Sequence, residues 1–170
     1  MGFFESIRRE GLIADNGYIR KCMNDRIHGI EIDNLLLDML LNEDSEHAAT
    51  FTNAQKSEFI FHLFRVLYVG GAMHQRDEFV NDYLETTKAL YKELLTVHKK
   101  STGSDGSAKI EAISKAYEVA LAPPAEGSRL FAGTVAEFAG TVAEHSRCYV
   151  IVDAMKRHST VIYSPFKPFW

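Results

Sequence analysis

The amino-acid sequence predicts an α+β protein with one domain, residues 1–170, in which a helical N-terminal two-thirds packs on a small antiparallel β-sheet. Through residues 1–100, apolar side chains recur at steps of three and four, the period of a helix with one buried face. From Arg147 to Phe166 two β-branched and aromatic runs flank a short basic turn, a pattern typical of an antiparallel hairpin. A chain of this length buries about 70% of its unfolded surface, so packing alone can stabilise it.

Composition and charge argue against several classes of protein. With 46% hydrophobic and 25% charged residues, the chain has an ordinary globular profile. The net charge of −4 comes from well-mixed charges, so we expect no nucleic-acid and no anionic-lipid partner. The N-terminus lacks the apolar segment of a signal peptide, and no apolar run approaches the roughly 20 residues that span a bilayer. Cys22 and Cys148 lie far apart, which fits a reducing cytosol rather than a disulfide framework.

The N-terminal part begins with a short helix. Phe3, Phe4 and Ile7 share one face of it, and Gly11 ends it as a glycine C-cap. A second, weaker helix is predicted from Ile13 to Met23. The third helix is the segment EIDNLLLDMLLN, because its apolar residues form a stripe at helical spacing: Ile32, Leu35, Leu36, Met39 and Leu40.

Two long helices follow. Thr52 and Asn53 are good cap residues, and the nearly all-apolar segment FIFHLFRVLY after them predicts a helix buried on most sides. Gly70-Gly71 ends this helix; the order helix-then-glycines favours a C-cap over a phosphate-binding loop. Residues 77–97 predict the second long core helix, with charged residues between the apolar ones.

Beyond residue 100 the sequence divides the domain further. We expect a helical body over 1–100, a flexible Gly/Ser connector over 101–107, and a small sheet over 108–170 with a low-complexity insert at 120–146. The segment from Lys109 to Val119 predicts a strand.

The insert contains a perfect tandem repeat, FAGTVAE FAGTVAE, over residues 131–144. Its spacing is compatible with a short amphipathic helix weakened by two glycines. A loop is favoured, because a coiled-coil seam needs three or more heptads.

No catalytic, cofactor or metal site is predicted. The sequence contains no HExxH, CxxC or GxSxG motif, and none of His47, His74 and His98 has a second His or Cys three or four residues away. His62, in the buried helix, is expected to be a core histidine. The remaining enzyme hypothesis is an unrecognised pocket lined by His62 or Asp153.

The turn of the hairpin is the first candidate binding surface. Lys156, Arg157 and His158 form a small projecting cationic patch that could meet an acidic partner surface. A merely solvated turn explains the same residues equally well.

The C-terminal tail FKPFW is the second candidate. Its aromatic residues, Phe166, Phe169 and Trp170, either pack onto the sheet, which is favoured, or anchor a partner, because aromatic clusters are enriched at interface hot spots.

Several long segments resemble one known family. They are MGFFESIRREGLIADNGYIRKCMND, EFIFHLFRVLYVGGAMHQRDEF, VNDYLETTKALYKELLTV and CYVIVDAMKRHSTVIY. The chain resembles the C-terminal portion of the cilia- and flagella-associated protein 300 family. Members of that family carry a further N-terminal region, so the chain is expected to be part of a longer protein. The resemblance does not extend to the connector or to residues 120–144, which contain the FAGTVAE duplication.

The resemblance implies a protein of the cytoplasm and of the motile cilium and its axoneme, without enzymatic activity. It implies a role in assembling outer and inner dynein arms in the cytoplasm or in delivering them to the axoneme. The implied partners are dynein-arm assembly factors, and intraflagellar-transport or dynein complexes. The alternative is a structural, microtubule-associated component of the axoneme. The family supplies no catalytic residue and no cofactor.

Overall fold

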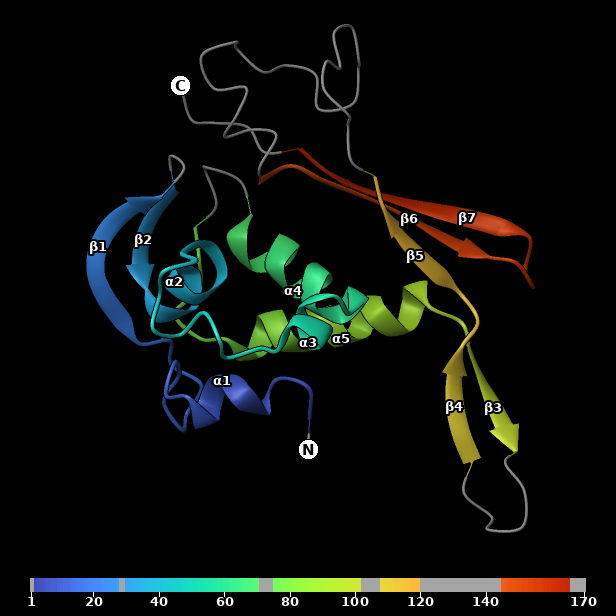
Figure 1. The fold of residues 1–170 in the computed structure, drawn as a ribbon, viewed down its shortest axis with the longest axis horizontal. Coiled ribbons are helices and arrows are strands. Elements are labelled where there is room, and N and C mark those ends of the chain that lie inside the picture. The colour runs from blue at the N-terminus through green and yellow to red at the C-terminus, as the bar shows by residue number, and fades with distance from the viewer. Residues whose placement is uncertain (1, 28–29, 71–74, 102–107, 120–144, 166–170) are drawn as a thin grey trace, which may run out of the picture.

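The structure is a computed structural model that describes residues 2–27, 30–70, 75–101, 108–119 and 145–165. Within these ranges the chain forms five helices and seven strands, which confirms a mixed α+β fold (Figure 1). The helices are α1 (Glu5–Arg9), α2 (Leu35–Leu41), α3 (Asn53–Lys56), α4 (Phe59–Val69) and α5 (Asn81–Leu94). The strands are β1 (Lys21–Ile27), β2 (Ile30–Asn34), β3 (Val97–Ser101), β4 (Ala108–Ala112), β5 (Lys115–Glu118), β6 (Arg147–Asp153) and β7 (His158–Ser164).

The opening helix is confirmed, and the helix predicted from Ile13 to Met23 is wrong. Gly11 follows α1 with a φ of 75°, the left-handed conformation of a glycine cap. Gly17 has a φ of 87° in a tight turn between the bridged residues Ile13 and Ile19. The chain then enters β1, which pairs antiparallel with β2. A turn that needs positive φ therefore replaces the second helix.

The third helix begins three residues later than its apolar stripe suggested. Ile32 lies in β2, and Asn34 adopts an extended conformation with a φ of −150° at the N-cap of α2. The Oδ1 atom of Asn34 accepts hydrogen bonds from the Leu37 amide at 3.0 Å and from the Tyr68 hydroxyl at 2.9 Å. This buried N-cap fixes where β2 ends and α2 begins.

The long apolar helix is confirmed as α4, although it does not start at the predicted caps. Thr52 instead caps the separate short helix α3, where Thr52 and Gln55 form a capping box. Gly70 ends α4 with a φ of 59°. The Arg76 guanidinium covers the same helix end by donating to the carbonyl oxygens of Tyr68 and Val69.

The predicted helix over 77–97 is shorter at both ends. It is α5, Asn81–Leu94, because Phe79 forms a β-bridge with Tyr18 before it and Val97 begins β3 after it.

The strand predicted from Lys109 to Val119 is two strands. β4 pairs with β3, whereas β5 pairs with β6 in a three-stranded antiparallel sheet of order β5-β6-β7. The break falls at Ile113 and Ser114, which hydrogen-bond to the backbone of Thr96. The predicted hairpin, by contrast, is confirmed as β6 and β7 with an unbroken register from Arg147↔Ser164 to Asp153↔His158.

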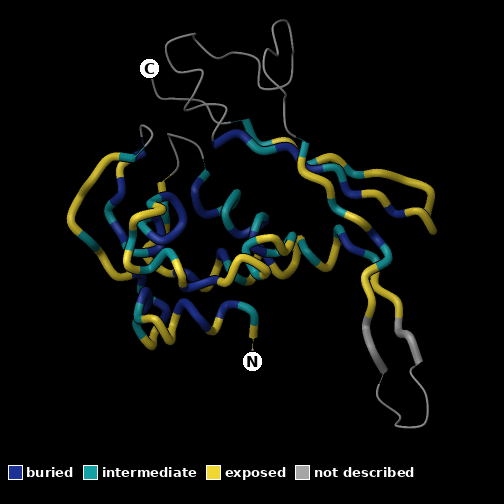
Figure 2. The backbone as a smooth tube through the Cα atoms, viewed as in Figure 1, coloured by how far each residue is buried: buried dark blue, intermediate teal, exposed yellow. Residues whose placement is uncertain are grey.

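Two clusters of buried side chains hold the described elements together. Figure 2 marks the buried residues in dark blue along the backbone. The larger cluster joins α1, α2, α4 and the β1–β2 hairpin, with Ile7, Leu36 and Phe64 fully buried. The smaller one packs the inner face of the three-stranded sheet on α4 and α5 through Tyr149 and Ile151. The helical part thus supports one face of the sheet. The connector predicted over 101–107 begins one residue too early, because Ser101 is the last residue of β3, and its residues 102–107 lie outside the described residues. The FAGTVAE repeat and the predicted tail residues Phe166, Phe169 and Trp170 also lie outside them.

Candidate functional site

The turn between β6 and β7 is held in place by one buried carboxylate. The Asp153 side chain is 3% exposed and accepts hydrogen bonds from the amides of Met155 at 3.0 Å and Lys156 at 2.9 Å. It also accepts a hydrogen bond from the hydroxyl of Thr96, in the segment between α5 and β3. These bonds, first of all the one from Thr96, lower the pKa of Asp153 below its ordinary value. The turn is consequently defined by side-chain bonds as well as by strand pairing.

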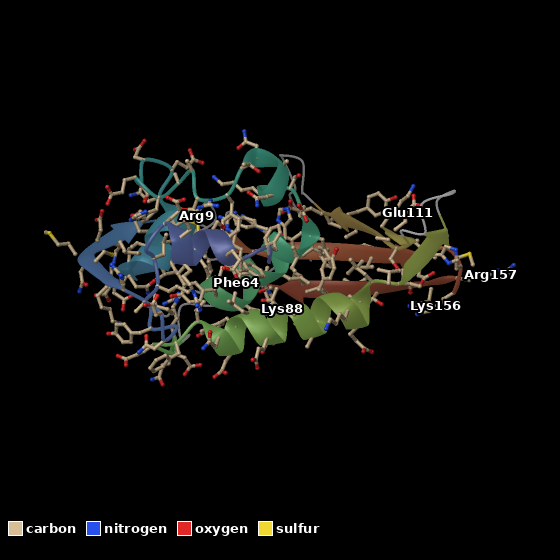
Figure 3. All side chains as sticks on the ribbon, turned by 90° about the horizontal axis from the view of Figure 1, so that it is seen from below. Arg9, Phe64, Lys88, Glu111, Lys156 and Arg157 are labelled. Carbon is tan, nitrogen blue, oxygen red and sulfur yellow. The ribbon has the colours of Figure 1, made fainter. Side chains whose placement is uncertain are left out.

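The three cationic residues predicted at the turn lie next to one another there, and all are exposed. Lys156 Nζ lies 3.9 Å from Asp153 Oδ2, while Arg157 has a φ of 54°, in the left-handed region. His158 is the first residue of β7, opposite Asp153. In Figure 3 Lys156 and Arg157 lie together at the end of the hairpin, beyond the end of α5. The tip therefore presents positive charge away from the helical body.

The outer face of the same sheet is largely apolar. Tyr117, Val150 and Val161 are in register across β5, β6 and β7, and form one row on the face opposite the buried Tyr149 and Ile151. Neighbouring apolar positions extend this row. The resulting outer face contains Tyr117, Val150, Val152, Val161 and Tyr163, with Lys115 and Ser159 beside Val152 and the buried Cys148 beside Tyr163.

The outer face is unusual in the described part of the molecule because several of its large apolar side chains are exposed to solvent. Among the described residues nine large hydrophobic side chains are exposed, and five of them belong to this sheet and its turn. Val161 is 59%, Tyr117 52% and Tyr163 43% exposed. A contiguous exposed apolar patch is typical of a protein–protein contact. The outer face and the cationic tip together form the candidate docking surface.

Sequence reasoning missed the outer face, although a signal was present. In the runs Val150–Val152 and Val161–Tyr163, every residue is apolar, whereas a strand with one solvated face alternates apolar and polar residues. Successive apolar residues in a strand place apolar side chains on both faces. One face is buried against α4 and α5, whereas Tyr117, Val161 and Tyr163 on the other face are exposed.

The inner face carries the histidine that sequence analysis singled out. His62 Nδ1 lies 3.2 Å from the Tyr149 hydroxyl, which joins α4 to β6. Burial lowers the pKa of His62 and raises the pKa of Tyr149 to about 12. Both groups are therefore uncharged at neutral pH. The pair adjoins a cleft of about 180 Å³ that Phe59 and Glu118 also line. We interpret it as a packing contact between helix and sheet.

The described ranges contain no group of three or more His, Cys, Asp or Glu side chains that could hold a metal ion. None of the helices within them is long and apolar enough to cross a membrane.

The family model and the relatives that match this chain all indicate the same family. The family model described as cilia- and flagella-associated protein 300 matches residues 1–164. A protein of that name from Chlamydomonas reinhardtii is 31% identical over 159 residues, which cover 94% of this chain and 58% of the relative. One from Paramecium tetraurelia is 30% identical over 99 residues, or 58% of this chain and 39% of the relative. No solved structure matches. The chain thus spans little more than half the length of the first of these relatives and less of the second.

Proposed function

The chain belongs to the cilia- and flagella-associated protein 300 family, and we propose that it is a non-enzymatic adaptor for axonemal dynein arms in motile cilia. In this proposal it acts during cytoplasmic preassembly of the outer and inner arms or during their transport to the axoneme. Its partners are then dynein-arm assembly factors, or intraflagellar-transport or dynein complexes. The family match over residues 1–164 carries the proposal.

The docking surface supports an adaptor in particular. The outer face offers exposed aromatic and β-branched side chains on a regular sheet, and Lys156 and Arg157 flank it at the tip. Aromatic and arginine side chains dominate the energetics of many protein interfaces. The two titratable side chains on the inner face, His62 and Tyr149, lie within hydrogen-bond distance of each other where α4 packs on β6, which supports a role in packing.

A structural component of the axoneme is the second candidate function. The name of the relatives, cilia- and flagella-associated, fits a protein fixed permanently to microtubules equally well. Fractionation separates the two. An assembly or transport adaptor is expected mainly in the soluble cell-body extract, whereas a structural component remains with axonemes through salt extraction.

The direct test is a null strain of a ciliated cell. We expect immotile or weakly motile cilia whose cross-sections lack outer and inner dynein arms by electron microscopy. Normal arms in the null strain would contradict the adaptor proposal.

A further inference from the structure

Within the part of the chain that the structure describes, β7 pairs with β6 on one side and with no strand on its second side, because it is last in the order β5-β6-β7. An open edge presents backbone N–H and C=O groups that can hydrogen-bond to an added strand. Proteins usually protect such edges with charged residues, proline, bulges or short length.

Other strands of the molecule carry this protection. β1 contains Lys21, Asp25 and Arg26, and its register with β2 is irregular between Lys21 and Asp25. β5, the opposite edge of the three-stranded sheet, has only four residues and carries Lys115 and Glu118. Both of these edges are poor templates for pairing.

β7 lacks each of these devices. It has seven residues in unbroken register with β6, and contains no proline, Lys, Arg, Asp or Glu. Its outward side chains Val161 and Tyr163 are exposed and continue the apolar row of the outer face. A strand added here would extend both the hydrogen-bonded ladder and the apolar surface.

The charges near this edge favour an acidic segment. At the tip, Lys156, Arg157 and His158 are exposed, while the carboxylate of Asp153 is buried and lies 3.9 Å from Lys156 Nζ. Glu118, the acidic residue of β5, lies 3.5 Å from Arg147 at the other end of the sheet. An added strand would therefore meet net positive charge where it passes the tip.

We infer that the edge of β7 binds an extended segment of a partner protein, with apolar residues at alternate positions and acidic residues at the end beside Lys156 and Arg157. This inference rests on the proposed adaptor function and specifies its binding mode. Backbone hydrogen bonds to β7 supply the pairing, and contacts with Val161 and Tyr163 supply the apolar part. Lys156 and Arg157 determine which end of the bound segment lies beside the turn, because they attract its acidic residues.

Photo-crosslinking in ciliated cells tests the chemistry of the occupant. Benzoylphenylalanine is placed at Val161 and, as a matched control, at Met23 on β1, which is 91% exposed. We expect Val161 to crosslink to partner peptides that combine alternating apolar residues with acidic ones, and Met23 not to do so. Peptides without acidic residues, crosslinks only to a second copy of this chain, or equal yields at both positions would overturn the inference.

Hydrogen–deuterium exchange then tests the binding mode, with a synthetic peptide of the crosslinked segment as the probe. Strand addition predicts slower exchange of β7 amides on binding. The double variant Lys156→Glu/Arg157→Glu should bind the peptide about tenfold more weakly. Peptide binding that leaves exchange in β7 unchanged would overturn edge pairing.

The proposed function and the edge-binding inference can be disproved independently of each other. Normal dynein arms in null cells would remove the proposed function whatever Val161 crosslinks to. Missing arms together with a failed crosslink or exchange result would leave the function standing and remove the edge-binding inference.

Discussion

The hydroxyl of Thr96 donates a hydrogen bond to the carboxylate of Asp153 across 57 residues of sequence. The bond ties the segment after α5 to the last residue of β6, and the same carboxylate holds the turn through the amides of Met155 and Lys156. One buried side chain therefore sets both the position of the hairpin on the helices and the direction of its cationic tip.

Replacement of Asp153 by Ala should lower the urea midpoint of unfolding, because it leaves the Thr96 hydroxyl and two turn amides without their acceptor. Thr96→Val removes only one of these bonds and should have a smaller effect. A double-mutant cycle measures the coupling of the two residues. Additive effects of the two substitutions would contradict the coupling described above.

The free energy of unfolding should fall on mild acidification because His62 is partly buried in the folded protein. Burial lowers the pKa of His62 from 6.5, so below pH 6.5 the unfolded chain takes up a proton that the folded chain resists. The stabilisation is present above this pH and is lost as pH falls toward the folded-state pKa. Urea unfolding between pH 8 and 5, compared with His62→Gln, measures the effect. An NMR titration with the His62 pKa at or above 6.5 would disprove it.

Gly17→Ala should destabilise the protein more than Gly11→Ala. Both glycines have positive φ, at 87° and 75°, so each alanine costs about 1 kcal/mol for the left-handed backbone. At Gly17 the added Cβ would also lie 2.8 Å from Asn81 Nδ2, whereas nothing lies within 4 Å at Gly11. Thermal unfolding of the two variants compares them, and Asn81→Ala should partly rescue Gly17→Ala. Equal losses would show that the contact with Asn81 is unimportant.

Tyr68→Phe should lower the free energy of unfolding by about 1 kcal/mol, since it removes one buried hydrogen bond to Asn34. Asn34→Ala removes that acceptor and the N-cap of α2 together, so about 2 kcal/mol is expected. Urea unfolding of both variants tests this order. A larger loss for Tyr68→Phe would mean that the cap contributes little.

The parts of the fold that sequence predicted depend on local signals. The apolar run of α4 and the β-branched runs of β6 and β7 are strong enough to define their elements without help from distant residues. Likewise the glycine at position 11 ends α1 through its own conformation.

The features that the sequence predicted wrongly are determined by contacts with residues distant in the sequence. The turn at Gly17 is completed by hydrogen bonds to Glu78 and Val80, and the start of α2 depends on the bond from Tyr68 to Asn34. Periodicity within a short window cannot show such partners. Similarly, the cationic tip was visible in the sequence, but the exposed outer face beside it became clear only when one face of the sheet was found against α4 and α5.

Rescue of null cells tests the central claim, that the outer face of the C-terminal sheet is the docking surface through which the protein acts. We compare Val161→Asp/Tyr163→Asp with Met23→Asp, all at exposed positions, after matching expression and thermal midpoints. The account predicts that Met23→Asp restores dynein arms in electron micrographs and that the double variant does not. Full restoration by the double variant would contradict it.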